Sequence, residues 1–355
     1  MKKLFETYTI NNKIIKNRIA IPAMCIAIYR EDGYVSDEVI EHYSSLAKGG
    51  AGLIVQEATC ISPTGRLMKT QLGIWEDGQI EGLHKITDTV HNEGGVILAQ
   101  IHHAGILTVD SIIDSPSDFE TVLYNGQKNI AHEMSLDRIE YIKNQFIEAG
   151  KRAFLAGYDG VELHAAHGYL LSQFLSKKIN IRKDSYGSNP EQLIIDISKG
   201  IRKITNKDFI IGIRLGGYEP DIVTVIDRVK KIEPFVDYLS VSYGFDKNSS
   251  IIPSIPDNLI YLPLIYAAKL IKEKVSIPVF AVGGITNAEM AKNIISETNV
   301  DMVNIGRGSL VNPNWSINAF EGKDTGKCFN CNNCAWFSDR NKCVGKIIFH
   351  RNNLN

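Results

Sequence analysis

Eight short apolar runs recur along the chain, and stretches with helical periodicity separate them. Short buried runs that alternate with amphipathic helices are typical of a parallel sheet, and eight such units close into a (β/α)8 barrel. We therefore predict an α/β protein with the TIM-barrel fold. The runs span residues 19–23, 52–56, 96–101, 160–163, 210–215, 238–241, 278–282 and 302–305.

Polar residues, glycine or cysteine follow nearly every run directly. The carboxyl ends of the strands form one face of such a barrel, and that face carries the chemistry. Two connections on it, 104–134 and 243–263, are long enough to be lids or binding walls. The residues predicted to be functional on this basis are Cys25, Gln100, His164, His167, Arg214, Gly283, Gly284 and Arg307.

Length and charge narrow the class of protein. The 355 residues, 44% of them hydrophobic, suit one large barrel, which we expect over 1–320, followed by a cysteine-rich tail over 321–355. The 39 basic and 40 acidic residues are mixed along the sequence, so we expect neither a nucleic acid nor a membrane as partner. With no apolar segment of signal-peptide or membrane-spanning length, the sequence predicts a cytoplasmic protein that acts on a small molecule.

Glycines follow the last two predicted strands. Gly283 and Gly284 come after the seventh, and Gly306 with Arg307 after the eighth. Backbone amides can approach an oxyanion closely at glycine, and arginine adds a bidentate charge, so the two loops together predict a phosphate site. Tight turns without a ligand are the alternative. A dinucleotide fold is excluded because the third glycine and its β/α unit are missing.

His164, His167 and Tyr169 leave the fourth predicted strand within six residues. If the chain turns there, two imidazoles can donate hydrogen bonds to one carbonyl oxygen that becomes negative, and a phenol can deliver a proton to carbon. The structural alternative is that the histidines fix loop carbonyls and that the tyrosine packs in the core. No lysine ends any of the eight runs, which argues against Schiff-base chemistry.

The segment Gly160-Val161-Glu162-Leu163-His164-Ala165-Ala166-His167-Gly168-Tyr169-Leu170-Leu171-Ser172-Gln173-Phe174-Leu175-Ser176, followed by Asn180, Arg182, Asp184, Tyr186 and Gly187, resembles the signature of the Old Yellow Enzyme family. The resemblance extends over about residues 1–320, with one motif at each barrel corner. Its other parts are Lys16-Asn17-Arg18, Pro22-Ala23-Met24, Glu57-Ala58-Thr59, Gly306-Arg307 and Asn312-Pro313.

This resemblance implies bound FMN and an ene reductase. NADH or NADPH would reduce the flavin, and an enone or enoate would then accept hydride from flavin N5 in a ping-pong cycle. His164 and His167 would hold the substrate carbonyl and Tyr169 would donate the proton. The residues implied to bind the cofactor are Ala23, Met24, Cys25, Ala58, Gln100, Arg214, Gly283, Gly284, Gly306 and Arg307.

The chain departs from one subgroup of the family at two places. The subgroup that carries a cysteine at the position of Cys25 has a substrate-facing tyrosine two residues later, where this chain has Ala27, with Tyr29 beyond it. That subgroup also completes its neighbour's pocket with a carboxyl-terminal arginine, whereas this chain ends in the cysteine-rich tail. A homo-oligomer is left open, without shared active sites.

Cys328, Cys331, Cys334 and Cys343 lie close together in the tail. Three thiols at x2 spacing favour a [4Fe-4S] cluster over zinc, which usually takes two separated pairs, and cysteines without metal are a third reading. The tail resembles that of the trimethylamine dehydrogenase and 2,4-dienoyl-CoA reductase branch. That likeness leaves two rivals open: an iron-sulfur flavoprotein, oxidising an amine or reducing a dienoate, that exchanges electrons with a carrier such as ferredoxin, and a flavin redox sensor without turnover.

Overall fold

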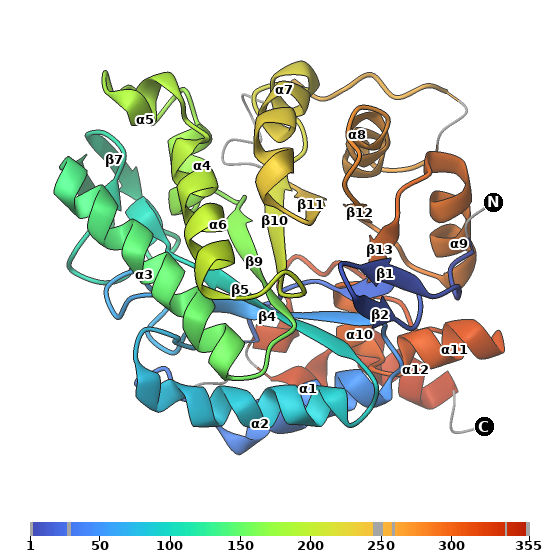
Figure 1. The fold of residues 1–355 in the computed structure, drawn as a ribbon. Coiled ribbons are helices and arrows are strands. Elements are labelled where there is room, and N and C mark those ends of the chain that lie inside the picture. Colours follow the sequence, from blue (N-terminus) through green and yellow to red (C-terminus); the bar gives the residue numbers. More distant parts are fainter. Residues whose placement is uncertain (1–2, 27–29, 244–250, 258–259, 338, 353–355) are drawn as a thin grey trace.

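The computed structural model describes residues 3–26, 30–243, 251–257, 260–337 and 339–352. Its centre is a closed barrel of parallel strands in the order β3, β4, β5, β9, β10, β11, β12, β13 (Figure 1). Each strand overlaps one predicted apolar run, so the predicted TIM barrel is confirmed. The strands span Ile19–Ile21, Leu53–Cys60, Val96–His102, Gly160–Ala165, Ile210–Gly216, Tyr238–Ser242, Val279–Val282 and Met302–Asn304.

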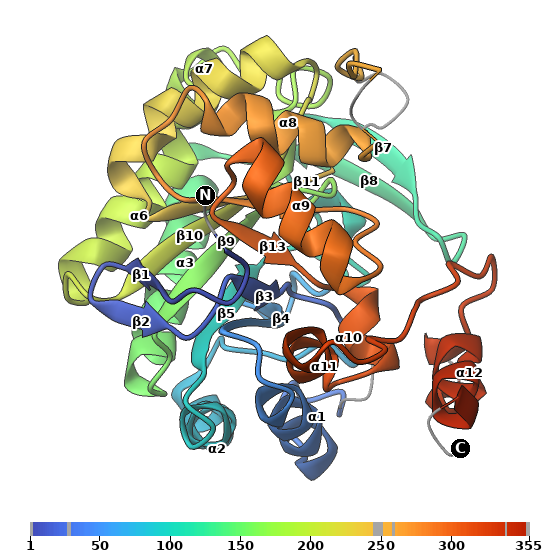
Figure 2. The same cartoon turned by 90° about the vertical axis from the view of Figure 1, so that its right-hand side faces the viewer.

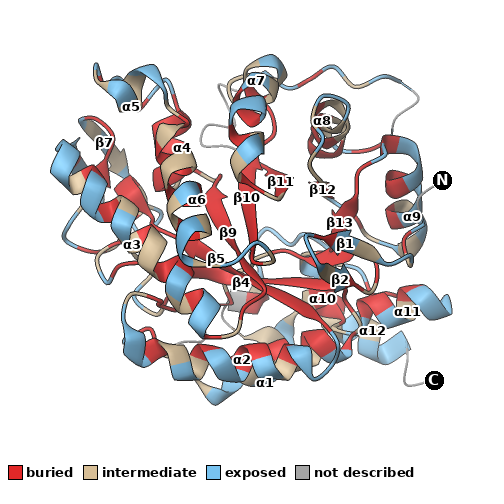
Figure 3. Ribbon diagram, in the orientation of Figure 1, coloured by how far each residue is buried: buried red, intermediate tan, exposed pale blue. Residues whose placement is uncertain are grey.

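Helices surround the barrel, with buried residues on the faces turned to the strands and exposed residues on the outside (Figures 2 and 3). The longer ones are α1 (Asp37–Lys48), α2 (Ile80–His91), α3 (Leu136–Leu155), α6 (Gln192–Ile204), α7 (Ile222–Ile232), α8 (Pro263–Lys272), α9 (Ala288–Thr298), α11 (Trp315–Glu321) and α12 (Val344–Asn352). Short helices are α4 (Leu170–Leu175), α5 (Ser185–Ser188) and α10 (Arg307–Val311). None of the helices in the described ranges is long and apolar enough to cross a bilayer.

An antiparallel hairpin that the sequence analysis did not anticipate packs on the amino-terminal end of the barrel. It consists of β1 (Tyr8–Ile10) and β2 (Lys13–Ile15). Ile10 and Ile15 are buried in one apolar cluster with the inward side chains of the strands, such as Leu53 and Leu98. The hairpin thus supplies the apolar floor of the barrel, opposite the face expected to carry the chemistry.

The connection 104–134, expected to be a long loop, forms a small sheet in the order β6, β8, β7. Its strands are β6 (Asp114–Ser115), β7 (Phe119–Val122) and β8 (Lys128–Glu133). Gly126 at φ +85° allows the tight turn between β7 and β8. The expectation that this segment is an irregular loop was therefore wrong, because it contains a sheet. The segment nevertheless stands beside the carboxyl ends of β4 and β5. Residues 244–250 and 258–259 of the other long connection, 243–263, lie outside the described residues.

Candidate active site

A tight turn follows β9, as the histidine spacing required. His167 and Gly168 both adopt positive φ, +60° and +80°, and the Tyr169 amide donates to the Ala166 carbonyl at 3.3 Å. The His167 amide also donates to the Tyr243 carbonyl at 3.1 Å, which ties the turn to the end of β11. This left-handed turn brings the side chains of His164, His167 and Tyr169 together at one corner of the barrel mouth.

The imidazoles form a continuous row across three strands. His164 Nε2 lies 3.0 Å from His167 Nδ1, and His167 Nε2 lies 2.7 Å from Ser242 Oγ. On the other side, His164 Nδ1 lies 3.2 Å from Nδ1 of His102, the last residue of β5. We expected His164 and His167 to direct nitrogens at one external point. They are adjacent as expected, but these nitrogens pair with neighbouring rings and with Ser242. Buried polar atoms in folded proteins are almost always hydrogen-bonded to a neighbouring group.

Tyr169 packs against this row. Its ring meets His102 edge-on, with centroids 4.4 Å apart, and meets His164 at 4.8 Å. Burial raises the pKa of Tyr169 above its ordinary value, so the phenol keeps its proton at neutral pH. Burial, followed by the neighbouring His167, holds the pKa of His164 well below its usual range. The site therefore offers a neutral phenol and a neutral imidazole.

Arg214 on β10 lies opposite His164 in the strand register. Its Nη1 donates to the Ala23 carbonyl at 3.1 Å, and its Nη2 donates to Ser242 Oγ at 3.4 Å. Its Nε is buried and has no hydrogen-bond partner in the part of the chain that the structure describes. Burial lowers the pKa of Arg214 from its usual value of 12.5. Because the ordinary pKa of arginine is so far above neutral pH, the side chain remains a cation. A buried cation with an unused donor fits a site for an anionic or electron-rich ligand.

Gln100 lies below this layer, inside the barrel. Its amide donates to Glu162 Oε1 at 2.7 Å, and the Tyr238 hydroxyl donates to Glu162 Oε2 at 2.8 Å. Gly212 makes room for the Tyr238 ring, which a Cβ at that position would meet at 2.0 Å. Burial raises the pKa of Glu162. Gln100 is fully enclosed here and does not line the cavity that opens at the mouth.

One cavity of about 280 Å³ connects the histidine corner with the glycine loops. Gly283 and Gly284 have φ values of +132° and +60°, which side-chain-bearing residues rarely adopt, so their backbone is shaped for the loop that the sequence predicted. The cavity is lined by Pro22, Met24, His167, Arg214, Ser242, Tyr243, Leu264, Val282, Gly283, Gly284, Ile285, Thr286, Asn304, Gly306, Arg307, Gly308, Gly326 and Cys328. The two predicted halves of the site thus share one cavity.

Arg307, at the start of α10, stands at the far end of this cavity and donates from Nη1 to the Asn330 side chain. A Cβ on Gly306 would approach Met24 Sδ to 3.3 Å, so the glycine keeps this end open. A guanidinium beside glycine backbone at one end and Arg214 at the other are the donors that FMN needs for its phosphate and its ring. The residues present therefore fit the group that the resemblance implies.

The first two corners of the barrel hold the remaining predicted cofactor residues. Cys25 is partly exposed and hydrogen-bonds to the backbone of Ala58, whose carbonyl accepts from the Gln71 amide at 2.8 Å. Burial of the thiol, with the neighbouring Glu57, raises the pKa of Cys25, so it is a thiol and not a thiolate. Ala27 and Tyr29 lie outside the described residues.

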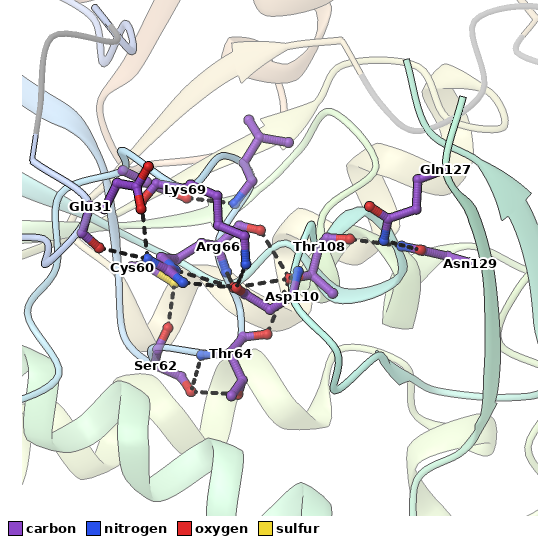
Figure 4. A network of polar contacts seen from close by, with 12 residues as sticks. Glu31, Cys60, Ser62, Thr64, Arg66, Lys69, Thr108, Asp110, Gln127 and Asn129 are labelled. Atoms are coloured by element: carbon purple, nitrogen blue, oxygen red, sulfur yellow. Dashed lines mark hydrogen bonds and ion pairs between the residues drawn. The ribbon is translucent and has the colours of Figure 1, made fainter. Parts of the chain in front are cut away.

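A charge cluster around the buried Asp110 carboxylate fixes the outer wall beside β4 and β5 (Figure 4). Arg66 binds Asp110 through Nε at 3.3 Å and Nη2 at 2.9 Å, and Lys69 adds a bond to the same carboxylate at 2.9 Å. Arg66 Nη1 also donates to the Glu31 carbonyl at 2.8 Å. Loops after three different strands are therefore joined at one arginine, which holds this side of the mouth in a defined shape.

The tail does not bring its four cysteines together. Cys331 and Cys334 are exposed, Cys328 and Cys343 are partly exposed, and none of the six cysteines is in a disulfide. Within the described ranges, no three His, Cys, Asp or Glu side chains converge as metal ligands. The described arrangement thus does not fit the predicted cluster or zinc site. Spacing along a chain makes such a site possible, but the fold of the tail decides whether the thiols meet.

Three partners of the predicted residues were missed by sequence reasoning. His102 and Ser242 extend the imidazole row, and Glu162 anchors Gln100. The sequence contains an indication of two of them, because His102 and Ser242 directly follow predicted apolar runs, as the predicted site residues do. Their role in the site becomes visible only from their hydrogen-bond partners on other strands.

Comparison with known protein families identifies the family of this chain. A model of the NADH:flavin oxidoreductase / NADH oxidase family matches residues 3–325. The chain belongs to this family. It is 34% identical over 346 residues to the NADH oxidase of Thermoanaerobacter brockii, covering 93% of this chain and 52% of that protein. The chain thus spans about half the length of this relative.

Solved structures agree with the fold. A 2-naphthoyl-CoA reductase in complex with 2-naphthoyl-CoA matches with a TM-score of 0.84 at 24% identity, covering 97% of this chain and 56% of that one. An Old Yellow Enzyme homologue from Zymomonas mobilis matches with a TM-score of 0.79 at 24% identity, covering 96% of this chain and 99% of that one. At this level of identity the likeness concerns the fold alone.

Proposed function

We propose that the barrel, residues 1–320, is an FMN-dependent oxidoreductase that uses NADH or NADPH to reduce the C=C bond of α,β-unsaturated carbonyl compounds. The observation that carries this proposal is the single cavity that joins His167 and Arg214 to the loops of Gly283, Gly284, Gly306 and Arg307. Family membership supports the flavin and the nicotinamide substrate.

The cofactor would be held from both ends of the cavity. Arg307 and the backbone of Gly283, Gly284 and Gly306 would bind its phosphate, and Arg214 would place positive charge beside its ring. Ala23, Met24, Cys25 and Ala58 would contact the ring from the first two strands. Gln100 would contact it from below once its amide turns away from Glu162. Bound FMN supplies a carrier that accepts hydride from one substrate and gives it to another.

The residues of this chain would handle the proton and the developing negative charge. His164 and His167 would donate hydrogen bonds to the substrate carbonyl as its oxygen becomes negative, which requires the row of imidazoles to open toward the substrate. Tyr169 would give its proton to the α-carbon while the β-carbon gains hydride, so NAD(P)H and one proton are consumed for each alkene reduced. The two substrates would use the site in turn, in a ping-pong cycle.

The described tail does not fit a metal, so no step of this proposal involves a cluster. Longer relatives include an NADH oxidase and a 2-naphthoyl-CoA reductase, of which this chain covers 52% and 56%. A conjugated thioester is one form of the proposed α,β-unsaturated carbonyl substrate. Electron exchange with a soluble carrier and a sensor without turnover are the competing outcomes.

An anaerobic ultraviolet-visible spectrum followed by stopped-flow mixing tests the proposal. We expect the flavin spectrum in the protein as isolated, bleaching by NADH or NADPH, and reoxidation by cyclohexenone at a rate that saturates with its concentration. A colourless protein would refute the cofactor. A flavin that NAD(P)H reduces but that no enone or enoate reoxidises would refute the ene-reductase activity and favour a carrier or a sensor.

A further inference from the structure

His102 is a third imidazole in the site, and the proposed reaction leaves it without a role. It ends β5, is fully buried, and lies with Nδ1 3.2 Å from Nδ1 of His164. Its ring also meets the Tyr169 ring edge-on at 4.4 Å. Its other nitrogen, Nε2, is buried without a hydrogen-bond partner among the described residues. One histidine therefore touches the two neighbours that the proposed reaction depends on.

In the hydrogen bond between His102 Nδ1 and His164 Nδ1, one nitrogen must carry the proton and the other must accept it. Burial lowers the pKa of His102 to about 3 and that of His164 well below its usual range, so both rings are neutral at pH 7. A neutral imidazole has one N–H and one bare nitrogen. Either His102 donates from Nδ1 and its Nε2 is bare, or His164 donates from Nδ1 and His102 carries its proton on Nε2.

The partnerless Nε2 of His102 distinguishes these two arrangements. A buried N–H without an acceptor is rarer and more costly than a buried acceptor without a donor. His102 therefore carries its proton on Nδ1 and leaves Nε2 bare. Because His164 Nδ1 then accepts that proton's hydrogen bond, the single proton of His164 must sit on Nε2.

We propose that His102 is a positioning residue that fixes His164 as the tautomer with its proton on Nε2. In the structure, that N–H lies 3.0 Å from His167 Nδ1, and the same direction of donation continues from His167 Nε2 to Ser242 Oγ at 2.7 Å. The consequence for catalysis rests on the proposed function, because only this tautomer lets His164 donate from Nε2 to a substrate oxygen. The opposite tautomer would present a bare nitrogen to an oxyanion.

Two variants of His102 separate the donor from the bulk of the side chain. His102→Asn retains an N–H at about the place of Nδ1, whereas His102→Met fills the space and offers only the weak acceptor of a thioether. In the FMN-loaded protein, 15N NMR of the nine histidines reads the protonated nitrogen of each ring directly. We expect an Nε2–H signal for His164 in the wild type and in His102→Asn, and an Nδ1–H signal in His102→Met.

A wild-type His164 with its proton on Nδ1 would overturn the proposal, and so would an unchanged His164 tautomer in His102→Met. Kinetics provide the second readout. Reoxidation by cyclohexenone should fall about 100-fold in His102→Met, as for loss of one oxyanion donor, and stay near wild type in His102→Asn. If no enone reacts at all, the proposed function fails, while the NMR result still decides the role of His102.

Discussion

Replacement of Tyr169 by phenylalanine isolates the proposed proton donor. The change removes the hydroxyl group and keeps the ring that packs on His102 at 4.4 Å and on His164 at 4.8 Å. The imidazole row therefore keeps its support, and the loss measured is that of the proton.

The structure places the expected magnitude near the low end of general acid catalysis. A positioned acid contributes about 10²–10⁴-fold, and it contributes most when its pKa lies near the working pH. Burial raises the pKa of Tyr169 further above neutrality, so proton transfer has little driving force. We expect a loss of about 100-fold in the reaction with the alkene, or about 2.7 kcal/mol of barrier.

Stopped-flow measurement of the two half-reactions separates this effect from general damage. Reduction by NAD(P)H should change less than about twofold, because it requires no proton from the phenol. Tyr158→Phe is a matched control, since that buried hydroxyl contacts Gln56 and does not line the cavity. Equal losses in both half-reactions of Tyr169→Phe, or none in the alkene step, would refute the assigned role.

Three further predictions follow from other contacts. Arg307→Ala should weaken FMN binding at least tenfold by equilibrium dialysis while leaving the barrel folded by circular dichroism; unchanged affinity would exclude Arg307 as a phosphate ligand. Asp159→Asn should lower the free energy of unfolding by about 2 kcal/mol, because Asp159 binds Lys13 at 2.7 Å and His91 at 2.8 Å. The partners of Asp159 lower its pKa, and Asp159 raises the pKa of His91 above 6.5. In urea titrations the difference in unfolding free energy between wild type and variant should therefore be full between about pH 4 and 6.5, and it should shrink in acid and as the pH rises through the raised His91 pKa. A difference that does not depend on pH would contradict this origin. Metal analysis of anaerobically purified protein should find no stoichiometric iron, sulfide or zinc, whereas cluster stoichiometry would show that the four tail thiolates converge after all.

The barrel was predictable because each of its units is encoded locally. An apolar run followed by an amphipathic helix identifies a strand and its crossover wherever it occurs, and His164, His167 and Tyr169 are close enough in sequence to share one turn. The sheet within 104–134 was missed because its strands are short and half-exposed, with little apolar periodicity.

The missed parts of the site are tertiary. His102 and His164 are 62 residues apart, and His167 and Ser242 are 75 apart, so only the closed barrel brings them within hydrogen-bond distance. The tail stays a prediction. Its cysteine spacing suggests a shared ligand, but in the described part of the chain no three of these side chains converge.

The hairpin beneath the barrel has an electrostatic consequence for the opposite end. Ile10 and Ile15 seal the interior with hydrocarbon, and Glu162, Gln100 and Arg214 are buried polar groups of the barrel strands. The apolar floor has a low dielectric constant and therefore screens the charge of the Arg214 guanidinium only weakly on that side. The electrostatic field of this cation is thereby focused into the cavity. Residues at the far end of the molecule thereby help to set the potential that a bound ring would experience.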